Sequence, residues 1–421
     1  KLKRMCSGAS LTVLWLCTFV SSSLINGVLS KSFKSVSYCE RHLNKVLLQP
    51  KFKNVVVQAF DDHINETGFV YSDLTLYHQL IGMYALGSGY VREDIRDHLG
   101  LDPTCDNVLL CAGMDNVIQG LIHRQSPKMF SYVSILYHQN NTAVMGLDAC
   151  ATPIEHDFNK DLDTVFLEIN RGYKENFPYS DLTVNPNNVF YLFITSRVSA
   201  DVFGNVTQTK GVQHTFSDLR GEKYSPNWLE IPGPWWRGYR SPHQEPGNKS
   251  DCPSYVDLYR AQINNGSLYS LFFKPEFTAN VTYNEKKKCF REIFGGIRGY
   301  INLAIDGNSS FPISPNTYDR IAVPMMDLST IIDLKTTIQE EIEPLFESNE
   351  IEGIGRRRHS LHELSTWENM SNKPDNITEK KATSPPVKIY LRKPFVYAIV
   401  DNSTKIVLKA GAFLRPEKAS L

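Results

Sequence analysis

The sequence lacks the short motifs that commonly mark an enzyme active site. It contains no G-x-S-x-G nucleophile elbow, no phosphate-binding P-loop, no H-E-x-x-H zinc motif and no G-x-G-x-x-G turn after a strand pattern. Its 11 histidines are scattered, and none of its cysteines forms a C-x-x-C pair that would suit zinc. We therefore predict that the protein is not an enzyme and that it requires no metal or other cofactor.

An excess of charge of either sign is also absent. The chain has 45 basic and 45 acidic side chains, which give a formal net charge of zero. Binding to nucleic acid or to an anionic membrane through the overall field of a protein needs a basic excess, so neither partner is expected. With 42% hydrophobic and 21% charged residues in a chain of 421, the composition is typical of a globular protein with one large domain or two closely joined ones.

The apolar run near the amino end is too short to cross a bilayer. This run, Leu11–Val20, follows the basic segment Lys1–Arg4 and precedes the small residues Ser21–Ser23. Such an order of basic, apolar and small residues is typical of a secretory signal peptide. We expect residues 1–30 to be this signal peptide, with more than one acceptable cleavage site, and the mature protein to be secreted and extracellular. A signal anchor is the alternative.

Glycosylation sequons are more frequent than chance predicts. The pattern Asn-x-Ser/Thr occurs ten times, against about four times expected for this composition. The excess favours real glycan attachment at the surface of a secreted protein. The predicted attachment sites are Asn65, Asn140, Asn205, Asn248, Asn265, Asn280, Asn308, Asn369, Asn376 and Asn402.

Cysteine usage agrees with secretion. Cys6 and Cys17 belong to the predicted signal peptide, which leaves six cysteines in the mature chain. Six cysteines in an oxidising compartment allow one to three disulfides, and spacing alone does not decide how they pair. The six are Cys39, Cys105, Cys111, Cys150, Cys252 and Cys289.

Apolar periodicity predicts a mixture of helices and long strands. The predicted helices are 51–66, 71–86 with a stop at Gly87, 91–99, 106–122 and a short one over 330–342. Residues 130–137 and 188–198 read as strands, and the second is apolar on both faces, as in the centre of a sheet. The fold class is therefore α+β with an antiparallel or mixed sheet.

Residues 231–253 are rich in proline and glycine and read as an extended surface excursion. Within it, Trp235 and Trp236 are either a binding patch or, as we favour, side chains that pack the excursion against the body. Two basic runs, Arg356–Arg358 beside His359 and His362, and Lys286–Lys288, are open to a similar choice. They form either pH-sensitive or heparin-attracting patches or, as we favour, solvated loops.

The carboxyl end reads as a half-buried hairpin. Residues 388–413 alternate apolar and polar on either side of a turn at Asp401–Thr404. This segment, "LRKPFVYAIVDNSTKIVLKAGAFLRP", resembles the closing strands of the serpins. "VYSDLTLY" resembles the family's Phe-Ser-Pro-x-Ser segment with Asp73 in place of proline, "YALGSGYVREDIRDHLGL" resembles its helix pair, and "NVFYLFITSRV" resembles the third strand of its sheet A, without the usual Lys-Gly-x-Trp after it.

The resemblance covers residues 51–416 and implies the serpin fold. That fold has three β-sheets, about eight to nine helices and an exposed reactive-centre-like loop. Residues 31–50 would then be an amino-terminal tail and 417–421 a carboxyl-terminal tail.

Within the family, "SYCERHL", "SPNTYDRIAVPM" and "KPDNITEKKATSPPVKIYLRKPF" are similar to the members that serve as hormone precursors. That likeness implies a Cys39–Cys105 disulfide and an amino-terminal peptide presented to a renin-like aspartic protease, for vasoactive or blood-pressure signalling. The expected hormone motif, Arg-Val-Tyr-x-His-Pro-Phe, occurs nowhere in the chain, and Lys31–Tyr38 reads "KSFKSVSY".

By the same resemblance, the loop hinge falls on Asn372, Lys373, Pro374, Asp375, Asn376, Ile377 and Thr378. An inhibitory serpin inserts this segment into a sheet after cleavage. Pro374 lacks an amide donor, Asp375 would be buried, and Asn376 is a sequon; each of the first two defects costs about 2–3 kcal/mol, and a glycan cannot enter a sheet at all. We therefore predict a non-inhibitory protein.

The nominal scissile bond would be Ala382–Thr383, with Lys380 and Lys381 as a trypsin-like alternative, so a serine protease could cut the loop as a substrate. Two other functions remain open. The protein could be a secreted serine-protease inhibitor with an atypical loop, or a carrier of a small apolar ligand or hormone, with Trp235 and Trp236 as the first place to look.

Overall fold

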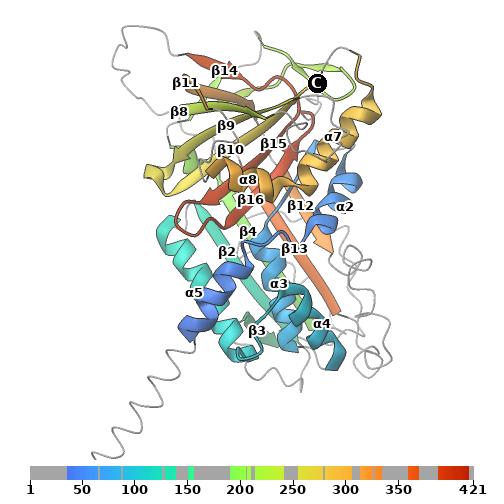
Figure 1. The fold of residues 1–421 in the computed structure, drawn as a ribbon, viewed down its shortest axis with the longest axis vertical. Helices are drawn as coiled ribbons and strands as arrows, with labels where there is room; N and C mark the ends of the chain where they lie inside the picture. The colour runs from blue at the N-terminus through green and yellow to red at the C-terminus, as the bar shows by residue number, and fades with distance from the viewer. Residues whose placement is uncertain are drawn as a thin grey trace, which may run out of the picture.

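The computed structural model describes fourteen stretches of the chain, which hold two large β-sheets and the helices around them (Figure 1). No helix in these stretches is both long and apolar enough to cross a membrane. The described residues are 36–64, 67–86, 89–125, 129–138, 150–155, 190–204, 206–209, 214–240, 255–277, 280–305, 313–325, 328–333, 359–368 and 387–416.

The four helices predicted in the first third of the mature chain are confirmed to within a few residues, because apolar periodicity and stop signals such as Gly100 are local features. Residues 36–46 form one more helix, whose Leu43 and Val46 are buried in the core. The other helices are α2 (Lys53–His63), α3 (Asp73–Leu86), α4 (Gly89–Leu99), α5 (Asn107–Gln125), α7 (Tyr283–Gly295), α8 (Ile297–Ile305) and the short 3₁₀ turns η3 (Ala200–Phe203) and η5 (Asn264–Gly266).

One sheet, called here the nine-strand sheet, runs in the order β1-β16-β15-β10-β9-β8-β11-β14, with β5 paired to β8. All its pairs are antiparallel except β11 with β14. Its strands are β1 (Gly68–Tyr71), β5 (Thr207–Thr209), β8 (Trp228–Arg240), β9 (Tyr255–Ile263), β10 (Leu268–Glu276), β11 (Ile313–Pro324), β14 (Lys388–Tyr390), β15 (Phe395–Asp401) and β16 (Val407–Phe413).

The second sheet, called here the five-strand sheet, runs in the order β12-β13-β4-β2-β3. Its strands are β2 (Phe130–His138), β3 (Thr152–Glu155), β4 (Phe190–Ser199), β12 (Leu328–Asp333) and β13 (His359–Glu368). The strands predicted at 130–137 and 188–198 are thus confirmed, and the second is central. A small third sheet pairs β6 (Phe216–Ser217) with β7 (Lys223–Tyr224).

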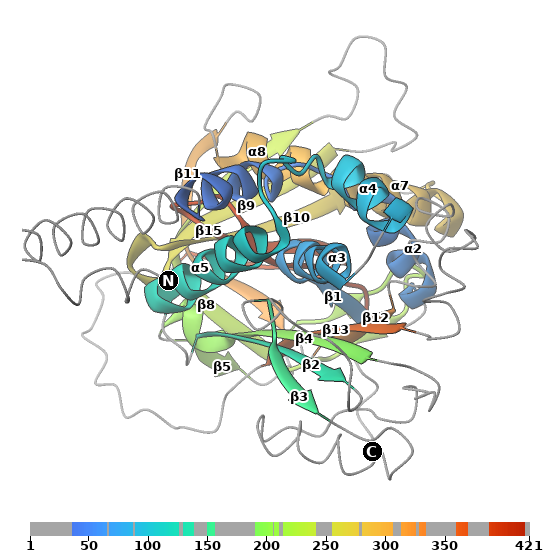
Figure 2. The same ribbon diagram turned by 90° about the horizontal axis from the view of Figure 1, so that it is seen from below.

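Helix α3 lies between the two large sheets, as Figure 2 shows. Gly82 permits the close approach, because a Cβ there would stand 2.4 Å from Leu192 of β4. Helices α2, α7 and α8 pack on the other face of the nine-strand sheet (Figure 1).

The predicted closing hairpin is confirmed as β15 and β16, with its turn at Asp401–Thr404. Asp401 fixes the turn, since its carboxylate accepts the Thr404 amide at 2.8 Å and its carbonyl accepts the Lys405 amide at 2.9 Å. The expectation that the hairpin is half-buried was wrong. Every residue of both strands is buried, because helices cover one face of the nine-strand sheet and α3 lies against the other.

The predicted helix over 330–342 is wrong where the structure describes it. Residues 328–333 form β12, which pairs antiparallel with β13. Thr330, Ile331 and Ile332 are β-branched and fit a strand, and the partner that decides the matter lies some thirty residues later. The rest of the predicted helix lies outside the described residues.

The predicted surface excursion is also wrong for residues 231–240, which belong to β8 between β9 and β11. Its prolines are tolerated because Pro232 stands beside a register shift between β8 and β11, where the ladder is already interrupted. Residues 241–253 lie outside the described residues.

Both basic runs were predicted as solvated loops, and the described parts are not. His359 and His362 belong to strand β13, while Arg356–Arg358 lie outside the described residues. Lys286–Lys288 lie in α7, which starts at a capping box between Thr282 and Glu285. That box is a local signal the sequence already contained.

Candidate functional site

The centre of the five-strand sheet is the feature on which a loop-insertion mechanism would act. Strands β4 and β13 lie side by side and parallel, in unbroken register from Phe190 opposite His359 to Ser199 opposite Glu368. Their outer neighbours β2 and β12 are antiparallel to them. The boundary between β4 and β13 is called the seam below, and in this structure it is closed.

Residues 369–386 connect β13, which ends at Glu368, to the segment of β14, on the far edge of the nine-strand sheet. The predicted hinge at Asn372–Thr378 and the predicted scissile bond at Ala382–Thr383 belong to this connection and lie outside the described residues. Their roles stay predictions.

A buried lysine lies beneath the seam. Lys409 of β16 is fully buried and its ammonium donates to the carbonyl and hydroxyl oxygens of Ser196 on β4, at 2.7 and 2.6 Å. The contact joins the nine-strand sheet to the five-strand sheet. A lone lysine in an apolar strand pattern carries no signal that names its partner, so sequence reasoning missed it.

The start of α3 carries a half-buried carboxyl, that of Asp73. Burial raises the pKa of the Asp73 carboxyl to about 6, against the opposing pull of the Arg298 guanidinium. Arg298 is 4% exposed and donates to the carbonyls of Leu48 and Lys405, at 3.2 and 3.0 Å. It therefore ties the segment after helix 36–46 to the hairpin turn.

A buried histidine on α3 is held in one tautomer. His78 Nε2 donates to the carbonyl of Cys150 at 2.6 Å, because a carbonyl can only accept, and Nδ1 accepts the Tyr132 hydroxyl at 2.8 Å. Burial lowers the pKa of His78 to about 4, so the ring is neutral at physiological pH. The group serves the packing of α3 against β2.

The helix over residues 36–46 is clamped to the turn after α4. The structure places Cys39 and Cys105, the pair implied by the resemblance, in a disulfide with an S–S distance of 2.02 Å and a Cα–Cα distance of 5.8 Å. The Tyr38 hydroxyl donates to the Asp102 carboxylate at 2.5 Å, and the Asp102 amide donates to His42 at 3.1 Å. The hydrogen bonds from Tyr38 and then from Thr104 lower the pKa of the Asp102 carboxyl to about 2. The set is called the tail clamp below.

Two further cysteines, Cys111 of α5 and Cys150 before β3, form a second disulfide, and Cys289 is disulfide-bonded as well. The sequence left these pairings open, since spacing does not reveal which helix faces which strand.

Three predicted glycan sites lie among the described residues. Asn265 is exposed in the turn η5, and Asn280 is exposed before α7. Asn402 is half-buried, and its side-chain amide donates to the carbonyl of Gly266 at 2.8 Å. The other seven sequons lie outside the described residues.

The two tryptophans proposed as a ligand site are engaged in packing. Trp235 is fully buried, lies 5.4 Å from Phe272 between ring centroids, and donates to the carbonyls of Ile231 and Pro232. The Arg260 guanidinium lies 5.8 Å from the Trp236 ring. The Lys286–Lys288 run is similarly engaged, since Lys286 donates to the Leu219 carbonyl and Lys287 pairs with Asp61.

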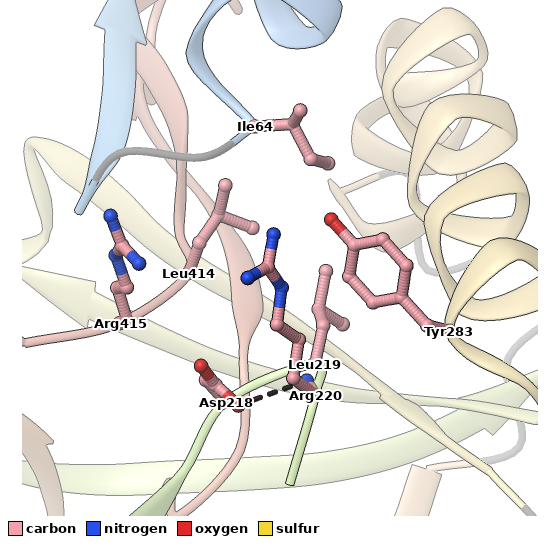
Figure 3. Close-up of a pocket in the computed structure, with 7 residues that line it drawn as sticks. All are labelled: Ile64, Asp218, Leu219, Arg220, Tyr283, Leu414 and Arg415. Carbon is pink, nitrogen blue, oxygen red and sulfur yellow. Dashed lines mark hydrogen bonds between the residues drawn. The ribbon is translucent and has the colours of Figure 1, made fainter. Parts of the chain in front are cut away.

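A small hollow lies between the turn that joins β6 to β7, the start of α7 and the residues that follow β16 (Figure 3). The side chains of Arg220 and Arg415 reach into it, with Asp218 at its base and the Tyr283 phenol across it. Arg220 stacks on the Tyr283 ring at 5.3 Å. Its cavity volume of about 20 Å³ is that of a water molecule, too small for a hormone-sized ligand.

No family model matches the sequence, and no curated protein is significantly similar to it. Solved structures are similar over most of the chain. A structure of native protease nexin-1 with heparin aligns at a TM-score of 0.62 and 14% identity, covering 88% of this chain and all of the other. The chain has the serpin fold.

Other serpin structures agree. A tumour-suppressing serpin aligns at a TM-score of 0.63, and maspin at 0.59, each at 14% identity over 89% of this chain. Identity this low shows the fold alone. The predicted fold class is thus confirmed.

Proposed function

We propose that the protein is an extracellular, glycosylated, non-inhibitory protein of serpin fold that carries its amino-terminal segment as a protease substrate, in the manner of angiotensinogen. The processing enzyme would be a renin-like aspartic protease, and the released peptide a vasoactive signal of diverged sequence. The protein itself would catalyse nothing. The single observation that supports this role best is the tail clamp.

The tail clamp fixes the amino-terminal segment at one place on the body. A disulfide that spans 66 residues restricts the unfolded chain by about 4 kcal/mol in the loop-entropy model. Cys39 and Cys105 are buried, whereas the neighbouring Tyr38 is 46% exposed. Ser37 and Tyr38 therefore lie at the surface beside a rigid anchor, which is the arrangement that a presented peptide requires.

Disulfides also support an extracellular location, because they persist in oxidising compartments. The packing of Trp235 and the small volume of the hollow at Tyr283 give no support to a ligand carrier within the described part of the chain. Protease trapping would require the ten residue pairs between β4 and β13 to separate and a new strand to enter between them. A segment with Pro374, Asp375 and Asn376 cannot form all the hydrogen bonds of such a strand, which argues against trapping.

The proposal is tested with secreted full-length protein. Its amino terminus is sequenced, and the protein is then incubated with a renin-like aspartic protease and, separately, with trypsin-like serine proteases. We expect the aspartic protease to release a peptide from the segment before Cys39. We expect the serine proteases to cut near Lys380–Thr383 without forming a complex that survives denaturing electrophoresis. A stable covalent complex would instead favour the inhibitor.

The role of the clamp is tested by the double variant Cys39→Ser/Cys105→Ser. Removing the clamp should change the rate of amino-terminal cleavage, because the segment is no longer held beside Asp102. The matched control is Cys111→Ser/Cys150→Ser, which removes the disulfide between α5 and the segment before β3, keeps Cys39–Cys105, and should leave that rate unaltered. Equal rates in all three proteins would reject the presenting role.

A further inference from the structure

Four side chains meet at the carboxyl end of β14. Tyr390, the last residue of β14, is flanked by His214, whose ring centroid lies 3.8 Å away, and by Arg392, whose guanidinium carbon lies 5.6 Å from the ring. The edge of Trp228 closes the cluster at 5.3 Å. His214 and Arg392 come from segments 178 residues apart.

The contact between His214 and Arg392 requires a neutral imidazole. Arg392 Nη2 lies 2.7 Å from His214 Nδ1, and a guanidinium can only donate, so Nδ1 must accept with its lone pair. A proton on Nδ1 would place two cations in direct contact. The backbone of His214 is held in place, because its carbonyl accepts the Trp228 indole at 3.2 Å.

The charges around His214 favour this neutral state. Burial and then the Arg392 cation lower the pKa of His214, while Glu230 opposes them. Glu230 is 2% exposed and is already paired with Lys388 of β14 at 2.8 Å and with Arg320 of β11 at 3.7 Å. The carboxylate of Asp218, the residue after β6, accepts the backbone amides of Arg220 and Glu222.

Strand β14 has three residues and, among the described residues, pairs with β11, from Arg320 opposite Lys388 to Ala322 opposite Tyr390. Its amino end is also held by the ion pair of Lys388 with Glu230 and by the Val387 carbonyl, which accepts the amides of Asp319 and Arg320. At its carboxyl end, the Leu391 amide donates to the Ala322 carbonyl and the Arg392 carbonyl accepts the Ser217 amide. An edge strand this short depends on its side-chain contacts, and the cluster at Tyr390 supplies those at its carboxyl end.

We propose that His214 and Arg392 form a pH-sensitive clasp on Tyr390, which holds β14 on the nine-strand sheet at neutral pH and releases it when the imidazole takes up a proton. The carboxyl side of the 369–386 connection would then be firmly anchored in neutral fluid and loosened in an acidic compartment. This inference rests on the contacts around Tyr390 and is independent of the proposed presenting role.

The sign follows from linkage. The pKa of His214 is lowered while the clasp is closed, so the closed state binds fewer protons than the released state. The free energy by which the clasp holds β14 is therefore fully present above the ordinary pKa of histidine, near 6.5. It is lost as pH falls through the lowered pKa. Release of β14 should therefore increase on acidification, by about tenfold for each unit by which the cluster depresses the pKa.

Hydrogen–deuterium exchange of the intact protein at pH 7.5 and 5.5 tests the clasp, after correction for the intrinsic pH dependence of exchange. We expect peptide 387–392 to open several-fold more at pH 5.5, relative to the core peptide 395–401. In Arg392→Gln the difference should shrink, because an amide donates to the neutral ring and accepts from the protonated one, while the burial of His214 remains. It should vanish in His214→Phe, which keeps an aromatic ring beside Tyr390.

The matched control is His123→Gln, an exposed histidine on α5, which should keep the wild-type pH response. The clasp is rejected if the wild-type peptide 387–392 opens equally at both pH values. It is also rejected if the pH response persists in both Arg392→Gln and His214→Phe. The wild-type comparison stands even if a variant fails to fold.

Discussion

The link between Arg298 and the start of α3 makes a quantitative prediction. Arg298 is buried, donates to the carbonyls of Leu48 and Lys405, and is the cation that opposes the raised pKa of Asp73. Arg298→Met preserves much of the volume but removes both donors and the cation that acts on the half-buried Asp73 carboxyl. A hydrogen bond from a charged group is worth about 1.5–3 kcal/mol, so we expect the loss of the two to cost about 3–5 kcal/mol at pH 7.5.

The assay is equilibrium denaturation in urea at pH 7.5 and pH 5.0. The pKa of Asp73 is raised from 3.8 to about 6 in the folded protein. Between pH 7.5 and pH 5.0 the folded state therefore binds more protons than the unfolded state, and its free energy of unfolding increases as pH falls. Without Arg298 this pKa rises further. The penalty of Arg298→Met should therefore shrink at pH 5.0, and it should be smaller in an Asp73→Asn background.

The control is Arg291→Met, since Arg291 pairs with Asp61 at 3.2 Å but is 55% exposed and should cost less than about 1 kcal/mol. Two results would refute the reasoning. One is a penalty for Arg298→Met no larger than that of the control. The other is the same penalty in the Asp73→Asn background, which would show that the two groups are not coupled.

Two further predictions concern β16 and the glycans. Gly411→Ala would place a Cβ 2.2 Å from the Phe69 carbonyl oxygen and should cost about 3 kcal/mol or more in thermal unfolding, as β1 is forced away. Gly299→Ala, where a Cβ meets open space, should leave the stability unchanged or increase it. A similar loss of stability in both variants would contradict the close packing of β16 on β1 at Gly411. Glycopeptide mapping should find Asn265 occupied more fully than Asn402, whose amide already donates to Gly266 and whose oxygen accepts Lys405. Full occupancy of Asn402 would contradict that arrangement.

Local patterns in the sequence predicted the helices α2 to α5 and the β15–β16 hairpin, because periodicity, Gly100 and the Asp401 turn act within a few residues. Elements defined by distant partners were missed. Strand β12 depends on β13, and residues 231–240 form a strand because β8 lies between β9 and β11. Proline and glycine in 231–240 favour a loop locally, and the tertiary context overrides them.

The candidate site divides in the same way. The resemblance pointed to Cys39 with Cys105, which the structure joins, while the proposed hinge at Pro374 and Asp375 stays a prediction from the sequence. Neither the Lys409–Ser196 contact nor the His214–Arg392 pair has a sequence signature, because each joins segments that only the folded chain brings together.

The central claim is that residues 372–378 cannot become a strand between β4 and β13. The most direct test is to cut the intact protein near Lys380–Thr383 with a trypsin-like protease and to measure its thermal unfolding midpoint before and after. The account predicts an unchanged midpoint and free, active protease. A large rise in the midpoint, together with a covalent protease complex, would contradict it.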